Sequence, residues 1–371
     1  MRNFTFKRLF LAVVFIVLGS LSIQAADDDG LITKQITIKL EKAGTLPNKI
    51  GSTKKFQITN LKIIGEINGK DLRMIREMAG IDVRGNDTDG VLSVLDLSDA
   101  KVVEGGDYYF GYYCTSNDKI GDYAFYGCFG LKSLTLPSGV TYLGDSAFHG
   151  CSGLTSITLP SGVTWIGDSA FRGCSGLTSI LLPSGVTRIG DSAFRGCSGL
   201  TSILLPSGVT YLGDSAFQGC SGLTSITLPS GVTKIGAWTF YGCSGLTSLT
   251  LPSSVTEIGG SAFKDCSGLT SIYVCTEKLP DMGRDVFDGC DAKKCTVYVP
   301  KGTYDDYWLS EFGYFENIVE FDPTGINNVI TSNDAKEHSR YSVNGQRLSA
   351  PTKGLNIVKY SDGSVKKVAV Q

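Results

Sequence analysis

Residues 143–165 read LGDSAFHGCSGLTSITLPSGVTW, and units of this kind follow one another without a break from residue 120 to residue 257. Three residue types recur in these units with a period of 23 residues. They are the phenylalanines Phe125, Phe148, Phe171, Phe194, Phe217, Phe240 and Phe263, the cysteines Cys128, Cys151, Cys174, Cys197, Cys220, Cys243 and Cys266, and the leucines Leu131, Leu154, Leu177, Leu200, Leu223, Leu246 and Leu269. A fixed period of this length indicates a solenoid, in which each coil can bury its apolar side only against its neighbours.

The order of apolar residues within one unit predicts the shape of a coil. Leu154, Ile157 and Leu159 have the L-x-x-L-x-L spacing of a leucine-rich repeat, and the alternation from Ile157 predicts a short strand. Pro160 ends that strand because it has no N–H to donate. Asp145 stands where the N-cap of one helical turn would lie, before residues 146–148. We therefore expect a repeat solenoid with 23-residue coils, a parallel β-sheet, and short helical or 3-10 turns.

Residues 1–25 are typical of a secretory signal peptide. Arg2, Lys7 and Arg8 form a basic start, residues 9–18 are apolar, and residues 23–25 offer a cleavage site. The alternative, an uncleaved membrane anchor, is disfavoured because the apolar run is short for a span. No second apolar run of that kind follows. The mature chain is therefore expected to be exported and to have no membrane span.

Residues 26–118 differ in composition from the repeats and are expected to form an N-terminal cap, because the end of a solenoid would otherwise expose an unpaired apolar coil. Alternating apolar residues predict strands at 34–40 and 56–64, and residues 94–97 resemble the strand of a coil. Asn68-Gly69 predicts a turn. Residues 70–79 have apolar side chains at helical spacing and predict a helix.

The solenoid and its C-terminal cap are expected to span residues 119–321. Large aromatic residues near the end of this range are expected to cover the last coil, namely Tyr304, Tyr307, Trp308, Phe312, Tyr314 and Phe315. Residues 322–340 predict a polar linker. Residues 341–371 predict a small β-tail, with hairpin turns at Asn344-Gly345 and Asp362-Gly363.

The chain has eleven cysteines, an odd number, although exported proteins usually form disulfides. The cysteine column of the repeat predicts buried thiols that pack as small apolar groups, because side chains in register point alongside rather than toward each other. Zinc binding is the alternative, but only two histidines are available. The redox state of Cys114, Cys275, Cys290 and Cys295 stays open, and a disulfide could form among the last three.

The sequence contains no constellation that predicts catalysis, a cofactor or a metal site. His149 and His338 are the only histidines and are expected to be solvated, and no phosphate-binding loop or paired-carboxylate motif occurs. The repeated aspartates could be imagined as a calcium ladder, but one carboxylate per coil fits a helix cap better, since calcium takes six to eight oxygens. A net charge of −2 without a basic stripe argues against nucleic acid. An enzyme is not expected.

Most columns of the repeat are nearly constant, and the variation gathers in a few outward positions. Tyr, Trp and Arg often contribute most of the energy of an interface, and exposed apolar surface often marks a partner site. The variable columns place such residues before each Ile/Leu-Gly pair, after each phenylalanine, and on the strand. They give a candidate protein-binding face of Tyr142, Trp165, Arg172, Leu181, Arg188, Arg195, Leu204 and Tyr211. Neutral variation at tolerant surface positions is the alternative.

The coils I/L-G-D-S-A-F-x-G-C-S-G-L-T-S-I-x-L-P-S-G-V-T-x resemble the BspA-like leucine-rich repeats of bacterial surface proteins, over roughly residues 120–300. Residues 61–69, 94–100 and 295–300 resemble that family's first and closing segments. The tail resembles a type IX secretion sorting module at residues 344–347, 354–358 and 367–370. The resemblance implies a cell-surface or secreted protein that adheres to host matrix proteins or other bacteria.

Two functions therefore stay open for a chain of this kind. One is an adhesin that binds a protein ligand of the host matrix or a bacterial surface, as a monomer and without a cofactor. The other is a passive spacer or envelope scaffold with no specific ligand. If the tail is not a sorting signal, the chain is expected to stay in the periplasm.

Overall fold

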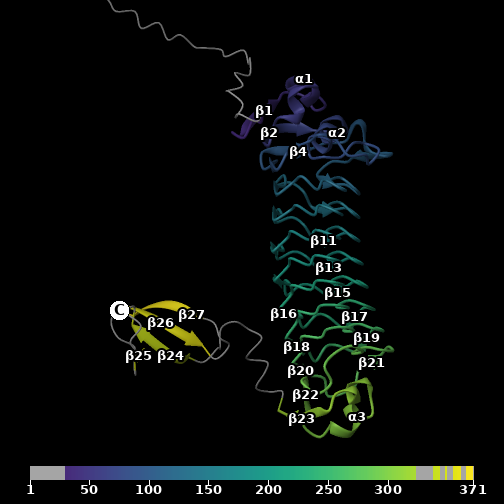
Figure 1. The fold of residues 1–371 in the computed structure, drawn as a ribbon, viewed down its shortest axis with the longest axis vertical. Helices are drawn as coiled ribbons and strands as arrows, with labels where there is room; N and C mark the ends of the chain where they lie inside the picture. The colour runs from purple at the N-terminus through teal and green to yellow at the C-terminus, as the bar shows by residue number, and fades with distance from the viewer. Residues whose placement is uncertain (1–29, 323–336, 343–346, 349–353, 361–364, 371) are drawn as a thin grey trace, which may run out of the picture.

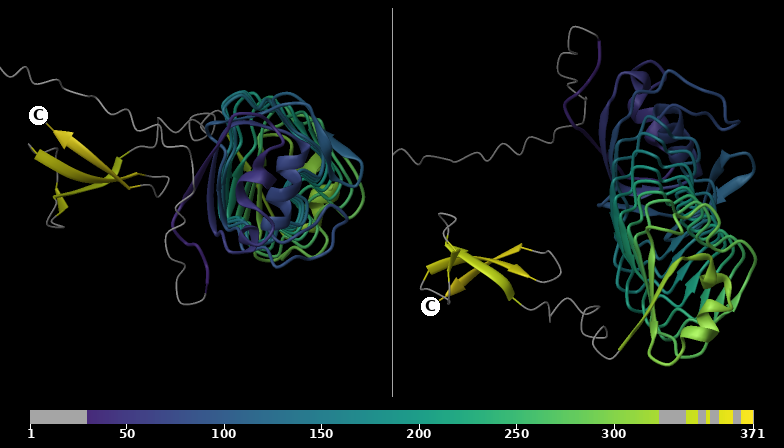
Figure 2. Two further views of the ribbon diagram at one scale, coloured as in Figure 1. Left: turned by 90° about the horizontal axis from the view of Figure 1, so that it is seen from above. Right: turned by 60° about the horizontal axis from the view of Figure 1, so that its bottom comes forward.

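The computed structural model describes residues 30–322, 337–342, 347–348, 354–360 and 365–370. The signal peptide predicted at residues 1–25, most of the predicted linker, and the turns predicted at residues 344–345 and 362–363 lie outside these described residues. The repeats form a rod of stacked parallel coils (Figure 1). Viewed along the rod, successive coils superpose as one closed ring (Figure 2). The predicted parallel solenoid is thus confirmed, with three sides to each coil.

The first side of each coil carries a two-residue strand, and these strands form one parallel sheet of eight. The apolar second residue of most strands is buried and the first residue faces outward. Equivalent residues of successive coils pair without a shift in register, so Trp165 pairs with Arg188 and Arg188 pairs with Tyr211. The strands are β7 (Lys119–Ile120), β9 (Tyr142–Leu143), β11 (Trp165–Ile166), β13 (Arg188–Ile189), β15 (Tyr211–Leu212), β17 (Lys234–Ile235), β19 (Glu257–Ile258) and β21 (Asp281–Met282).

The second side carries the strand predicted from the L-x-x-L-x-L spacing. Its central isoleucine or leucine is buried and its flanking residues face outward. Strands β8 (Ser133–Thr135) and β10 (Ser156–Thr158) continue the sheet of the N-terminal cap. The remaining strands form a sheet of seven, namely β12 (Ser179–Leu181), β14 (Ser202–Leu204), β16 (Ser225–Thr227), β18 (Ser248–Leu251), β20 (Ser271–Val274), β22 (Thr296–Pro300) and β23 (Asn317–Phe321).

The third side has no strand, yet its coils are joined by a backbone ladder. Phe125 donates its N–H to the carbonyl of Ala147 at 2.7 Å, and Gly150 donates to Arg172 at 2.8 Å, with the same bonds in later coils. The predicted helical turn over residues 146–148 is wrong. Ser146 has φ of 54°, in the left-handed region, so the chain passes through separate hydrogen-bonded turns. The equivalent serines of the later regular coils share this conformation.

The N-cap interpretation of the repeated aspartates is wrong as well. No helix begins after Asp145; instead its Oδ1 accepts the backbone N–H of Asp168, one coil away, at 2.9 Å. Asp168 accepts from Asp191 in the same way at 2.8 Å, and Asp191 from Asp214 at 2.9 Å. The aspartates therefore form a side-chain ladder along the rod, each one joining its own coil to the next.

The core of the rod is a continuous stack of phenylalanine rings. Phe171 and Phe194 lie 5.3 Å apart between ring centroids, and Phe194 and Phe217 lie 5.4 Å apart, with nearly parallel planes. The stack ends at Phe287, whose ring contacts Phe312 at 5.0 Å and Phe315 at 5.1 Å. These two rings are fully buried beside α3 (Tyr304–Trp308) and η2 (Glu311–Tyr314). The predicted aromatic cover of the last coil is confirmed for the buried residues Tyr307, Phe312 and Phe315, whereas Tyr304, Trp308 and Tyr314 are exposed.

The N-terminal cap contains β1 (Ile36–Leu40), α1 (Leu46–Ile50), η1 (Lys54–Phe56), β2 (Asn60–Ile67), α2 (Gly69–Met78), β3 (Val94–Asp96) and β4 (Ala100–Val102). The predicted turn at Asn68-Gly69 is wrong, because Asn68 is the N-cap of α2 and forms a capping box with Asp71. The second predicted strand begins at Asn60 rather than at Phe56, which lies in η1.

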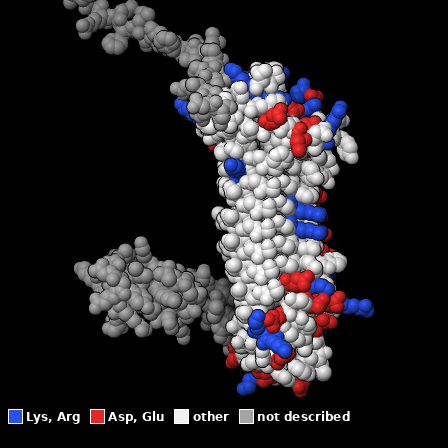
Figure 3. Space-filling model, viewed as in Figure 1, with Lys and Arg blue, Asp and Glu red and all other residues white. Residues whose placement is uncertain are grey.

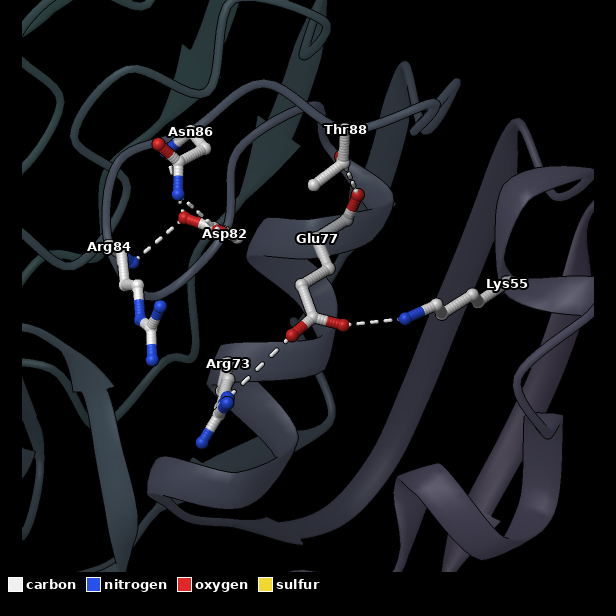
Figure 4. Close-up of polar contacts among 7 residues, drawn as sticks. All are labelled: Lys55, Arg73, Glu77, Asp82, Arg84, Asn86 and Thr88. Carbon is white, nitrogen blue, oxygen red and sulfur yellow. Dashed lines mark hydrogen bonds and ion pairs between the residues drawn. The ribbon is translucent and has the colours of Figure 1, made fainter.

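Polar contacts hold α2 to its surroundings in the cap. Glu77 accepts from Lys55 Nζ at 2.6 Å and lies 3.6 Å from Arg73 Nε, as Figure 4 shows. The Thr88 hydroxyl donates to the Glu77 carbonyl at 2.6 Å (Figure 4). Asp82 accepts from Asn86 within the following loop. These bonds orient α2 across the end of the rod.

The first coil is closed by side chains of α2 and of the hairpin β5 (Gly105–Phe110)–β6 (Tyr113–Thr115). Buried Arg76 donates from one terminal nitrogen to the carbonyls of Tyr123 (2.9 Å) and Ala124 (3.0 Å), and its guanidinium lies 4.4 Å from the Phe110 ring centre. The Tyr109 hydroxyl donates to the carbonyl of Asp122 at 2.7 Å. Carbonyl groups that no earlier coil can satisfy therefore find donors in the cap.

The described part of the tail forms an antiparallel sheet in the order β25-β24-β26-β27. Its strands are β24 (Glu337–Ser342), β25 (Arg347–Leu348), β26 (Gly354–Tyr360) and β27 (Val365–Val370). Strand β24 thus begins within the range predicted as linker. Among the described residues, no helix has the length and apolarity needed to cross a membrane.

Candidate functional site

The structure distributes the eight residues of the predicted face over the three sides of the coil. Four of them, Tyr142, Trp165, Arg188 and Tyr211, occupy the outward position of consecutive strands on the first side. Leu181 and Leu204 lie on the second side, in β12 and β14. Arg172 and Arg195 lie on the third side, after the buried phenylalanines. Only the first group forms a continuous cluster of side chains, here called the aromatic–arginine column.

The aromatic–arginine column is held together by ring contacts between neighbouring coils. Tyr142 meets Trp165 edge to face, with ring centroids 5.5 Å apart. The guanidinium carbon of Arg188 lies 5.7 Å from the Trp165 ring centre and 4.4 Å from the Tyr211 ring centre. Within the described residues Arg188 forms no ion pair. An arginine held between two rings keeps its fork of N–H donors available for a partner.

The surroundings of the column are polar at both ends. Lys119 Nζ lies 5.6 Å from the Tyr142 ring centre at the N-terminal end. At the other end Lys234 pairs with Glu257 at 2.7 Å. The Tyr211 hydroxyl donates to Asp191 Oδ1 at 3.3 Å, and burial, then the negative charge of Asp191, raises the pKa of Tyr211. The ring of Tyr211 is therefore oriented by a carboxylate three residues after Arg188, its neighbour in the adjacent strand.

Accessibility differs within the column. Arg188 and Tyr211 are exposed, whereas Tyr142 and Trp165 are half-buried. The indole N–H of Trp165 is shielded from solvent and has no hydrogen-bond partner among the described residues. The reachable part of the column is thus its C-terminal half, centred on the guanidinium of Arg188.

The two leucines of the second side border an apolar groove. Leu181 and Leu204 are 77% and 71% exposed, which makes them the most accessible aliphatic residues of the regular coils. The groove has a volume of about 850 Å³ and runs along the Leu-Pro-Ser corners of successive coils, past Pro183, Pro206 and Pro229. No charged residue lines it. Figure 3 shows how little charge the middle of the rod carries in that view.

Arg172 and Arg195 are half-buried on the third side and form no ion pair within the described residues. His149, one coil before Arg172, is also half-buried, and burial, then the charge of Arg172, lowers the pKa of His149. His149 contacts Tyr126 edge to face at 5.0 Å. The prediction that His149 is simply solvated is therefore wrong. The third side presents an unneutralised positive stretch over two coils.

The cysteines are free thiols throughout the described residues, including Cys275, Cys290 and Cys295. Those of the column are buried, as predicted, and from Cys151 to Cys266 each Sγ–H donates to the carbonyl of a phenylalanine in the preceding coil. Burial raises the pKa of Cys197 to about 12. Cys114 is exposed. In the described part of the chain, no group of three or more His, Cys, Asp or Glu could hold a metal ion.

The sequence analysis overlooked Trp238. Its ring is 49% exposed on the third side, at a position that is serine in the other regular coils of the middle of the rod. The survey of variable columns did not include this position because it is otherwise constant. A single tryptophan in a constant column is the signal that could have found it.

Comparison with known proteins identifies the repeat. The family described as "BspA type Leucine rich repeat region" matches residues 118–244 and 196–307, which together cover just over half of the chain. No curated protein matches.

Three solved structures illustrate the likeness. A leucine-rich repeat protein of T. pallidum is 37% identical over 42% of this chain and 72% of its own, with a TM-score of 0.40. One from Bacteroides ovatus is 22% identical, covering 80% of this chain and 97% of its own, with a TM-score of 0.30. A leucine-rich cell surface protein of Faecalibacterium prausnitzii is 19% identical, covering 84% and 96%, with a TM-score of 0.30.

Proposed function

The chain belongs to the BspA-type leucine-rich repeat family, and we propose that it is an adhesin exported to the bacterial surface, where the aromatic–arginine column binds a protein ligand. The observation that carries this proposal is the position of Arg188, whose guanidinium lies over the rings of Trp165 and Tyr211. Arg188 forms no ion pair within the described residues, although its charge acts on Asp168. Aromatic rings and an arginine in one cluster are the usual composition of an interface hot spot. A ligand that offers a carboxylate would complete it.

The rigidity of the solenoid supports this assignment. The three residues sit on strands whose register repeats without a shift, so the column is organised before any ligand arrives. Little conformational entropy is then lost at the site on binding. A passive spacer, the second function, needs no such column, and its outer positions could carry any solvated residue.

The binding experiment compares variants of the mature chain for saturable binding to immobilised host-matrix and bacterial-surface proteins. Arg188→Gln and Tyr211→Ala should each weaken the affinity for the partner so found by about tenfold, or about 1.4 kcal/mol, which is more than most interface residues contribute. Leu204→Thr, on the second side, is the matched control, because threonine stands at that position in the next coil. If all three variants bind with the affinity of the parent chain, the column is not the binding site. If no partner binds saturably, the spacer function is favoured.

Export is a separate part of the proposal and has a separate test. The tail is proposed as a sorting signal that follows signal-peptide cleavage. Removal of residues 325–371 should leave the melting temperature of the solenoid unchanged and keep the protein in the periplasm. Surface labelling of intact cells measures this. Undiminished labelling of the truncated chain would show that the tail does not direct export.

A further inference from the structure

The coil that begins at Ile235 departs from its neighbours at three consecutive positions. Ala237-Trp238-Thr239 replace the Asp-Ser-Ala of the preceding coil. Trp238 adopts φ of 54°, a left-handed conformation that is unfavourable for a bulky L side chain. The aspartate ladder also ends here, because Ala237 donates its N–H to Asp214 Oδ1 at 2.9 Å but has no side-chain oxygen to offer the next coil. The substitution thus places a bulky side chain in an unfavourable backbone conformation and ends the aspartate ladder.

At the buried position, Thr239, new hydrogen bonds compensate for the change. At the exposed position, Trp238, packing does not explain the side chain. Thr239 is fully buried, and its hydroxyl donates to the carbonyl of Gly236 at 2.8 Å, with Gly213 at 3.3 Å. Trp238, in contrast, leaves half of its surface in solvent. The Tyr241 N–H donates to the Trp238 carbonyl at 3.1 Å, so the two aromatic residues belong to one turn. Neither ring contacts another ring within the described residues.

The first coil shows what covers such a pair in this fold. Tyr123 and Tyr126 occupy the same two positions, five coils earlier, with the same left-handed φ (58°) at the first and the same backbone bond (3.0 Å) between them. The β5–β6 hairpin packs on that pair: the Phe110 ring lies 5.9 Å from Tyr123 and 5.4 Å from Tyr126. Tyr113 of the hairpin lies 4.9 Å from Tyr123. In the first coil these two positions thus receive aromatic side chains of the hairpin, and the rings of Tyr123 and Tyr126 also contact each other at 5.6 Å.

The charge around Trp238 and Tyr241 adds a second element of complementarity. Toward the C-terminus Lys264 pairs with Asp288 at 2.6 Å, and Asp265 lies beside Tyr241 and raises the pKa of its hydroxyl. Toward the N-terminus Arg195 and then Arg172 follow on the same side without an ion pair. At about 4.8 Å per coil they lie about 10 Å and about 14 Å from Tyr241 along the rod. A ligand with an aromatic residue at one end and carboxylates at that distance would match both features.

We propose that Trp238 and Tyr241 anchor a second binding site, on the third side, for a protein segment that places an aromatic side chain against them and carboxylates against Arg195 and Arg172. The site is independent of the aromatic–arginine column, which lies on the first side. A second copy of this chain is a poorer occupant. Two rods aligned in the same direction on this side would set their unpaired arginines against each other, and like charges repel. An antiparallel pair, which sets the arginines of one rod on the aromatic pair of the other, is the dimer that sedimentation tests.

The test uses the mature chain and a short β-hairpin peptide that carries one phenylalanine on one face and three carboxylates about 10 Å from it. Two further peptides replace the phenylalanine by alanine or the carboxylates by amides. Fluorescence anisotropy of the labelled peptides measures affinity. Trp238→Ser introduces the residue that the other coils carry, and Arg195→Gln introduces the residue of the next coil, so both variants should fold. Circular dichroism and the melting temperature check this.

We expect the acidic aromatic peptide to bind in the micromolar to millimolar range and to weaken as salt rises. Trp238→Ser and the alanine peptide should each reduce the affinity about tenfold. Arg195→Gln should remove about half of the salt dependence, since Arg172 remains, and Lys132→Gln, at an exposed residue beside β8 on the second side, should change nothing. The proposal is overturned if Trp238→Ser binds like the parent, if the alanine peptide binds equally well, or if no peptide binds below about 1 mM, the limit of weak specific contacts. Concentration-dependent dimers that Trp238→Ser abolishes, seen in sedimentation, would instead assign the site to a second copy.

Discussion

Cys174 donates its Sγ–H to the carbonyl oxygen of Phe148, 3.1 Å away in the preceding coil, and the same pairing recurs along the rod. The thiol therefore serves the fold as a buried donor. The Phe148 carbonyl also accepts the backbone N–H of Cys151 at 3.1 Å within its own turn, so the thiol is a second donor that ties one coil to the next.

This pairing predicts the reactivity of the thiols. Burial raises the pKa of Cys128 to about 11 and that of Cys197 to about 12, so the reactive thiolate is scarce at neutral pH. In native protein, Cys114 should react with a thiol probe within the fast phase, and the column only after unfolding. Cys114→Ser should abolish the fast phase. Peptide mapping that finds disulfides between column cysteines of adjacent coils would contradict the prediction.

The imidazole of His149 provides a titration test of the third side. Burial, then the charge of Arg172, lowers the pKa of His149 below its usual 6.5. The folded state thus binds the proton less well than the unfolded chain, so this contribution to stability is complete above pH 6.5 and falls as the pH drops below it. NMR titration should show the lowered pKa, and Arg172→Gln should raise it. Arg188→Gln is the control and should leave it unchanged. A His149 pKa at or above 6.5 in the parent would rule out this environment.

The left-handed serines predict a stabilising substitution. Ser192 has φ of 56°, where glycine is free of the steric cost that any L side chain carries. Ser192→Gly should raise the free energy of unfolding by about 0.5–1 kcal/mol, measured by urea denaturation. The control is Ser202→Gly in strand β14, where glycine should lower it by about the same amount. If both variants are destabilised alike, the left-handed turn does not form.

Deletion of one whole coil should leave the protein folded. Removing residues 166–188 joins two coil faces that have the same strands, the same phenylalanine stack and the same aspartate ladder. Circular dichroism should keep its shape, and the melting temperature should fall only slightly. Removing half a coil is the control, because it brings the wrong side of one coil onto the next. Aggregation of the whole-coil variant would argue against independent stacking.

The stacking of coils could be predicted from the sequence because residues such as Phe171 and Cys174 recur at a fixed period. Recognising a period requires no knowledge of the path of the chain within a coil. It did not predict the role of Asp145, because the partner of that carboxylate lies one coil away and depends on the exact register. The Asn68-Gly69 pattern is typical of a hairpin turn, but the capping box with Asp71 prevails.

The candidate face was predicted in part for the same reason. Trp165, Arg188 and Tyr211 belong to one column of the period, so their contact could be expected. Trp165 and Arg172, however, are only seven residues apart in the chain, and sequence alone does not say that the coil turns a corner between them. Trp238 was missed because its column is otherwise constant, and only the variable columns were taken to mark a binding face.

The uniform stack has a genetic consequence. Neighbouring coils are nearly identical in sequence, and Arg76 and Phe312 close the two ends through the first and last coils alone. Unequal recombination between two repeats of the gene adds or removes whole coils in frame, and neither end needs a compensating mutation. The length of the rod, and with it the distance between its two capped ends, can therefore change between strains in a single event.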